Sequence, residues 1–145
     1  MDIFEEISGR FSIDANQCPA TEEEIVSLKK FSTIEVPLEY LEIIRQATEI
    51  EIKVDNEMYI RIWGPNSCIE LNDAYYVQKY LPNSLAIGDD EGGGALVYLN
   101  GKDGFGIYMC RFADLDIEEA VKIAPSLYDL LVNNVGIDIA MSGYM

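Results

Sequence analysis

The sequence predicts an α+β fold in which helices pack on a central antiparallel sheet. Apolar residues recur at helical spacing near both ends of the chain, and in the middle they alternate with polar residues. Turns rich in glycine and asparagine separate the alternating runs. Such hairpins pair antiparallel, whereas parallel strands need crossover helices. No linker interrupts the chain, so we expect one domain over residues 1–145.

Two helices are expected near the N-terminus. Ile3, Phe4, Ile7 and Phe11 follow helical spacing and predict a short amphipathic helix over residues 3–11. Thr21 and Glu24 fit a capping box, in which each side chain accepts a hydrogen bond from a free amide of the other residue's backbone. This box predicts a helix over residues 22–31.

A third helix and a hairpin follow. Pro37 suits the first turn of a helix, where its missing N–H is not needed, and an apolar face continues to about Ala47. Isoleucine and valine then alternate with charged residues over residues 50–54, and residues 58–63 are again typical of a strand. The Asp55-Asn56 turn between them predicts an antiparallel hairpin.

The next segment predicts a helix and a strand. Asn72 or Asp73 is a suitable N-cap for a short helix that ends at Tyr80, before a proline. An apolar run over residues 84–88 predicts a strand after it.

The last third predicts a second hairpin and a final helix. Residues 94–99 and 105–111 are typical of strands, and the turn between them is rich in residues that accept positive φ. Pro125 begins a helix that Gly136 ends as a C-terminal cap. The pattern assigns no structure to the tail, residues 137–145.

Charge restricts the class of partner. The chain has 26 acidic and 10 basic residues, for a net charge of −16. Such a field repels nucleic-acid phosphates and anionic lipid headgroups, and it accelerates encounter with a basic protein. We therefore expect no direct nucleic-acid or membrane binding, although solubility alone also accounts for the charge.

The cysteines and the N-terminus indicate a cytoplasmic protein. Cys18, Cys68 and Cys110 lie far apart without a CxxC pair, so they predict idle thiols in a reducing compartment and neither a disulfide framework nor a zinc site. The acidic start lacks the basic region of a signal peptide, and no apolar run approaches the roughly 20 residues that span a bilayer.

Catalysis is disfavoured because the chain has no histidine. Histidine is the commonest general base and metal ligand, and the usual partner of a Ser or Cys nucleophile. Carboxylate pairs alone can still serve as acid and base. We expect a binding protein without metal or cofactor.

The most distinctive local feature is an acidic, glycine-rich connection between two apolar strands. Asp89, Asp90 and Glu91 precede three consecutive glycines. The segment lacks the ligand spacing of an EF-hand and the GK[ST] ending of a phosphate loop. It is either an exposed acidic tip for a partner or a cation, or a solvated tight turn. A carboxylate-dependent or cation-assisted hydrolase centred on these three residues is the remaining alternative.

Aromatic residues provide a second candidate surface. Tyr75, Tyr76 and Tyr80 lie on the expected helix before the proline, and tyrosine is enriched at interface hot spots. A helix must also bury one face, so these rings serve equally well as packing residues. Trp63 is expected in the core, because large aromatic side chains dominate cores.

Four segments, in order, resemble the SMI1/KNR4 family of the SUKH superfamily, over about residues 21–131. They are Val36-Pro37-Leu38-Glu39-Tyr40, Ile62-Trp63-Gly64, the turn from Ile87 to Gly94, and Ile123-Ala124-Pro125-Ser126-Leu127. The family-motif positions matched are Pro37, Tyr40, Trp63, Gly88, Gly92 and Gly93. Val36 stands where leucine is common, and Leu127 takes an aromatic position.

The resemblance implies an α+β fold with a central antiparallel sheet and a role in binding. Bacterial members are typically immunity proteins that neutralise a cognate toxin, often a nuclease. We therefore expect a cytoplasmic immunity protein that binds a basic toxin through an acidic surface at Asp89, Asp90 and Glu91, with Asp114 and Asp116.

Fungal members of the family regulate cell-wall glucan synthesis. They imply an alternative, a regulatory scaffold that docks a cellular protein through Tyr75 and Tyr76.

Overall fold

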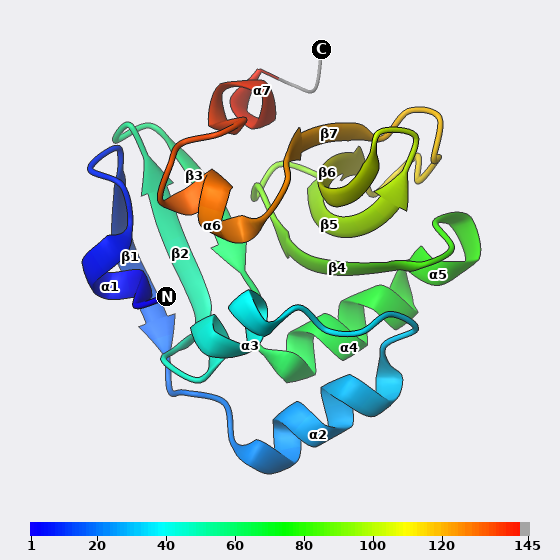
Figure 1. Ribbon diagram of the computed structural model, residues 1–145, viewed down its shortest axis with the longest axis horizontal. Coiled ribbons are helices and arrows are strands. Elements are labelled where there is room, and N and C mark those ends of the chain that lie inside the picture. The colour runs from blue at the N-terminus through cyan, green and yellow to red at the C-terminus, as the bar shows by residue number, and fades with distance from the viewer. Residues whose placement is uncertain (143–145) are drawn as a thin grey trace.

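The computed structural model describes residues 1–142, which form an α+β fold around one antiparallel sheet (Figure 1). Its strands lie side by side in chain order, each antiparallel to the next. The strands are β1 (Phe11–Gln17), β2 (Thr48–Val54), β3 (Met58–Ile62), β4 (Ser84–Asp89), β5 (Gly94–Gly101), β6 (Gly104–Arg111) and β7 (Val121–Ala124).

The helices surround this sheet. They are α1 (Ile3–Glu6), α2 (Glu22–Phe31), α3 (Leu38–Ile44), α4 (Pro65–Ala74), α5 (Val77–Tyr80), α6 (Leu127–Leu131) and α7 (Ile137–Met141). The sheet curls around α6, while α4 runs along its other side beneath β4 and packs against α2 (Figure 1). None of the helices within residues 1–142 has the length and apolar character needed to cross a membrane.

The two halves of the sheet differ in how they are covered. In β2 and β3, isoleucine and valine are buried on one face while charged residues lie on the other. In β4, β5 and β6 each strand has at least five consecutive buried residues, so both faces are covered along these runs. The outer face of β1–β3 is therefore the part of the sheet that the helices leave open.

Local signals in the sequence explain several elements. Thr21 and Glu24 form the predicted capping box at the start of α2, with hydrogen bonds of 3.1 and 2.8 Å. Asp55 and Asn56 both have positive φ, as a tight hairpin turn requires, and β2 pairs antiparallel with β3. The pairing of β5 with β6 is likewise confirmed.

The prediction for residues 3–11 is wrong beyond the first turn. The helix ends at Glu6, and Phe11 begins β1, the edge strand that pairs with β2. Phe11 and Ile13 alternate with polar neighbours, as in a strand with one buried face, but the residues of β1 after Ile13 are exposed.

The helix predicted from Asn72 or Asp73 to Tyr80 is also wrong. Helix α4 begins at Pro65, so Asn72 lies inside it and is buried. The helical conformation is then interrupted at Tyr76, which has a left-handed φ of 54°, before α5 begins.

The C-terminal segment differs from the prediction in its ends. Pro125 precedes the final predicted helix, which starts at an N-cap, Ser126, and stops at Leu131. Gly136 has φ of 80° and precedes α7 instead of ending a longer helix. Helix α7 occupies part of the unassigned tail, and residues 143–145 lie outside the described part. Strand β7 was not predicted.

At the start of α3, Pro37 is the N-cap residue, one position before the helical turn in which the sequence predicted it.

Candidate functional site

The acidic turn between β4 and β5 is closed by its own side chains. Asp90 Oδ1 accepts hydrogen bonds from the amides of Gly92 and Gly94, each 2.8 Å long. Glu91 has φ of 59° and Gly93 has φ of 98°, a conformation that glycine adopts without strain. The carboxylate of Asp90 thus fixes the shape of the turn.

The other two carboxylates of the turn are held by β3 and the residue after it. Asp89 Oδ2 accepts a hydrogen bond of 2.8 Å from the indole N–H of Trp63. Glu91 Oε1 lies 2.9 Å from Nη2 of Arg61. The turn is therefore fixed against the sheet as well as internally.

Arg61 is the centre of a polar row that crosses three strands, β2 to β4. Ala15, Glu51, Arg61 and Asp89 are successive cross-strand neighbours from β1 to β4. The same nitrogen of Arg61 that contacts Glu91 lies 3.2 Å from Glu51. Partial burial opposes the charged form, but the carboxylates of Asp89 and Glu91 outweigh it and raise the pKa of the guanidinium.

Aromatic rings continue this surface toward α4. Phe112, just after β6, lies with its ring centroid 6.1 Å from that of Trp63 and 4.4 Å from that of Tyr75. The amide of Phe112 donates a hydrogen bond to Gly93 O. Tyr75 and the acidic turn, which the sequence offered as rival surfaces, therefore belong to one continuous face.

The two other predicted aspartates have different surroundings. Asp114 forms a β-bridge with Arg111, which pairs with Gly94 at the turn, so Asp114 lies at the same end of the sheet. Asp116 instead accepts a hydrogen bond from the amide of Glu118 in a local turn of its own.

Tyr76 is 64% exposed at the junction of α4 and α5, and its ring lies 6.0 Å from Nζ of Lys79.

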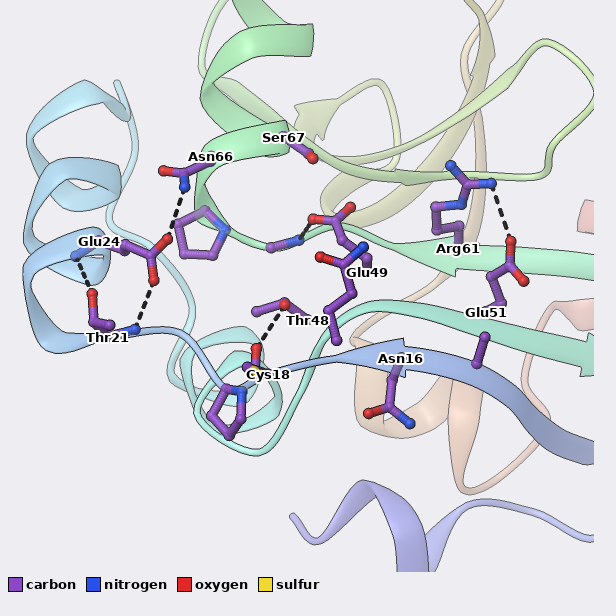
Figure 2. Close-up of a pocket in the computed structure, with 15 residues that line it drawn as sticks. Asn16, Cys18, Thr21, Glu24, Thr48, Glu49, Glu51, Arg61, Asn66 and Ser67 are labelled. Atoms are coloured by element: carbon purple, nitrogen blue, oxygen red, sulfur yellow. Dashed lines mark hydrogen bonds and ion pairs between the residues drawn. The ribbon is translucent and has the colours of Figure 1, made fainter.

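A cavity of about 1010 Å³ opens on the uncovered face of β1–β3 (Figure 2). Its walls are the N-terminal ends of α2 and α4, and its floor comes from the three strands. The charged side chains that line it are Glu24, Glu49, Glu51 and Arg61. The cavity was not predicted, because neither β1 nor the start of α4 is evident in the sequence pattern.

Each cavity glutamate has a defined contact in Figure 2. Glu24 Oε2 accepts a hydrogen bond of 2.8 Å from Asn66, and Glu49 Oε2 accepts one of 2.8 Å from the amide of Gly64. Glu51 contacts Arg61, so Arg61 joins the cavity to the acidic turn.

Thiol chemistry is disfavoured at the buried cysteines. Burial raises the pKa of Cys68 and of Cys110 to about 12, so both are protonated at neutral pH. Among residues 1–142, no group of three or more histidine, cysteine, aspartate or glutamate side chains is arranged to hold a metal ion.

Comparison with known families identifies the architecture. The SMI1 / KNR4 family (SUKH-1) matches residues 19–133, which include the acidic turn, Trp63 and most of the sheet. The chain belongs to this family. No curated protein matches the chain.

Several SMI1/KNR4 motif residues have structural roles. The hydroxyl of Tyr40, in α3, donates a hydrogen bond of 2.6 Å to the carbonyl oxygen of Trp63, and both side chains are buried. The prediction that Trp63 fills the core is therefore confirmed. A Cβ at Gly88 would lie 2.2 Å from the carbonyl oxygen of Arg61, so glycine lets β4 approach β3 closely.

Phe112 and Arg61 both contact this face, and neither was predicted as a contact residue. Phe112 lies in the turn after the last residue of β6, Arg111, so the alternating pattern of the strand does not extend to it.

Proposed function

We propose that this protein is an immunity protein that binds and neutralises a cognate protein toxin of the nuclease class in the cytoplasm. Its family supports a role in binding other proteins. The observation that carries the proposal is the continuous face of acidic turn and exposed tyrosine, on a chain with a net charge of −16. A nuclease holds phosphates in a basic groove, and an acidic face is complementary to that groove.

Inhibition by this route requires no catalysis. The partner-binding residues that we propose are Asp89, Asp90, Glu91, Asp114, Asp116, Tyr75 and Tyr76. Carboxylates steer the encounter with the toxin, while an aromatic residue such as Tyr75 supplies contact area at the centre of the interface. We expect association that is fast and weakens as salt is added, because salt screens steering between exposed charges.

Co-expression with the toxin encoded beside its gene tests the proposal. The wild-type chain is expected to protect cells. A triple variant Glu91→Gln, Asp114→Asn, Asp116→Asn is expected to protect less, because it removes acidic charge from three of the proposed partner-binding residues. The matched control neutralises three exposed glutamates elsewhere: Glu5→Gln, Glu35→Gln, Glu57→Gln. The absence of protection by the wild-type chain would refute the proposal.

The tyrosines favour a second candidate, a regulatory scaffold that docks a cellular protein. Tyr75, Tyr76 and Tyr80 are 43, 64 and 49% exposed. Tyr75 contacts Phe112 beside the acidic turn, so substituting it would disturb both candidate surfaces. A substitution of Tyr76 therefore distinguishes the scaffold from the immunity protein better. Loss of partner capture in Tyr76→Ala, with capture retained in the acidic triple variant, would support the scaffold.

A further inference from the structure

The cavity on β1–β3 is an acidic concavity built from separate parts of the chain. Three glutamates and one arginine line it, which gives a net charge of −2 (three negative, one positive). They come from α2, β2 and β3, which the fold holds rigidly together through the sheet and the packing of α2 on α4. A volume of about 1010 Å³ accommodates several side chains of a partner.

The carboxylates in the cavity retain capacity to accept hydrogen bonds. Glu49 uses Oε2 for the amide of Gly64, and Glu51 uses Oε1 for Arg61. Within the described residues, the second oxygen of each carboxylate accepts no hydrogen bond from the protein. A carboxylate accepts up to about four hydrogen bonds, so both can bind an incoming cationic donor without losing their present contacts.

Arg61 occupies the position between the cavity and the acidic turn. It contacts Glu51 in the cavity and Glu91 in the turn, at 3.2 and 2.9 Å, with 37% of its side chain exposed. A partner that covers both regions would bring its own cations to the same two carboxylates. Arg61 would then compete with the partner for them.

We propose that the cavity receives a basic segment of the partner protein, and that Arg61 holds, in the free protein, the position that a cation of this segment takes in the complex. The inference deepens the proposed function and rests on it, because the basic partner is the toxin. Charge complementarity and the second oxygens of Glu49 and Glu51 favour this occupant.

Binding of a hexa-arginine peptide to the full chain at low salt tests the cavity. We expect amide chemical-shift changes at Glu49, Glu51 and Asn66. The variant Glu49→Gln, Glu51→Gln keeps an acceptor for Gly64 and is expected to bind about fivefold more weakly, as the loss of two partly exposed ion pairs predicts. The charge-matched control Glu118→Gln, Glu119→Gln is expected to change affinity by less than about twofold. Equal losses in both variants would overturn the proposal.

A second variant tests the role of Arg61. Arg61→Gln is expected to bind the peptide about threefold more tightly, because it removes a competing cation from Glu51. Arg45→Gln removes the same charge from an exposed ion pair with Glu22, outside the cavity lining, and controls for net charge. An equal increase in both variants, or no increase in Arg61→Gln with an unchanged melting temperature, would contradict the competition.

The same variants distinguish the proposed immunity function from the proposed role of the cavity. If the wild-type chain protects cells from the toxin and Glu49→Gln, Glu51→Gln protects equally well, the immunity function stands and the cavity proposal fails. If the chain protects against no toxin while the peptide still binds in the cavity, the immunity function fails and the basic-segment site remains.

Discussion

The side-chain amide of Asn72 takes the place of a neighbouring strand. Strand β3 pairs with β4 only at its end, so Ala86 has no partner strand on that side. Asn72 Nδ2 donates to the carbonyl oxygen of Ala86 at 2.8 Å, and its Oδ1 accepts from the amide of Ala86 at 3.0 Å. A carboxamide has both a donor and an acceptor, as a peptide group does, so this buried asparagine completes the edge of β4.

Asn72→Ala is therefore expected to lower the free energy of unfolding by about 3 kcal/mol, because it leaves a buried donor and a buried acceptor unsatisfied. Asn66→Ala, at an exposed position of the same helix, is expected to cost less than about 1 kcal/mol. Urea unfolding followed by circular dichroism measures both values. Similar losses in the two variants would show that the buried amide has no special role.

Gly88 is a second residue at which stability depends on side-chain size, because β3 leaves no space for a Cβ atom there. In Gly88→Ala the added methyl group would overlap the carbonyl oxygen of Arg61, and the expected loss of stability is about 3 kcal/mol from forced separation of the strands. A Cβ at Gly9 meets nothing within 4 Å, so Gly9→Ala is the matched control. Melting temperatures that fall equally would exclude the close approach as the cause.

At the scale of elements, the sequence predicts the strands in which buried residues follow a regular pattern. Strands β2 and β3 alternate because one face is open, and β4 to β6 form continuous apolar runs because both faces are covered. Strand β1 was missed because its exposed edge position leaves little apolar pattern after Ile13. Helix α4 was missed because its buried residues, Pro65, Cys68 and Asn72, include few that an apolar period would reveal.

The candidate site was predictable only in part for the same reason. The acidic turn is contiguous in sequence, so its glycines and carboxylates mark it directly. The cavity is assembled from α2, β1, β2, β3 and α4, two of which the sequence did not predict. The contacts of Arg61 with Glu51 and Glu91 depend on the pairing of three strands, which no local pattern contains.

The attachment of α7 is expected to depend on pH. Arg10 lies 2.7 Å from Asp55 and 2.8 Å from Asp138, in the first turn of α7, and it lowers the pKa of both carboxyls below 3.8 through hydrogen bonds. A depressed pKa contributes stability that is fully present above the unfolded value and is lost as pH falls through the folded value. Below about pH 4, α7 should therefore loosen.

Amide hydrogen exchange of Ala140, whose amide donates to the carbonyl oxygen of Gly136, measures this effect between about pH 3 and pH 6 after correction for intrinsic rates. In Arg10→Gln the protection of α7 should be lower at pH 6 and should vary less with pH. A variant that kept the wild-type pH dependence would exclude Arg10 as the source.

At the scale of the whole molecule, self-repulsion among acidic residues opposes folding. With a net charge of −16, the compact state concentrates negative charge that the unfolded chain spreads out. Raising sodium chloride from about 10 to about 100 mM shortens the screening length from about 30 to about 10 Å, and the melting temperature is expected to rise. A melting temperature that falls would show that the local ion pairs outweigh the repulsion.

One hydrophobic core connects the helices with all seven strands, so we expect residues 1–145 to unfold as one domain. Thermal transitions followed by far-ultraviolet circular dichroism and by fluorescence should coincide. Transitions that separate would indicate that β1–β3 and β4–β7 unfold independently.

The hydrogen bond from the indole of Trp63 to Asp89 also makes the acidic turn visible in solution. Trp63 is the chain's single tryptophan, so all tryptophan emission originates within hydrogen-bonding distance of this turn. A partner that displaces or neutralises Asp89 changes the field at the indole and therefore shifts its emission wavelength. The unlabelled protein thus reports occupancy of its own candidate interface, and a tryptophan-free partner can be titrated without any dye.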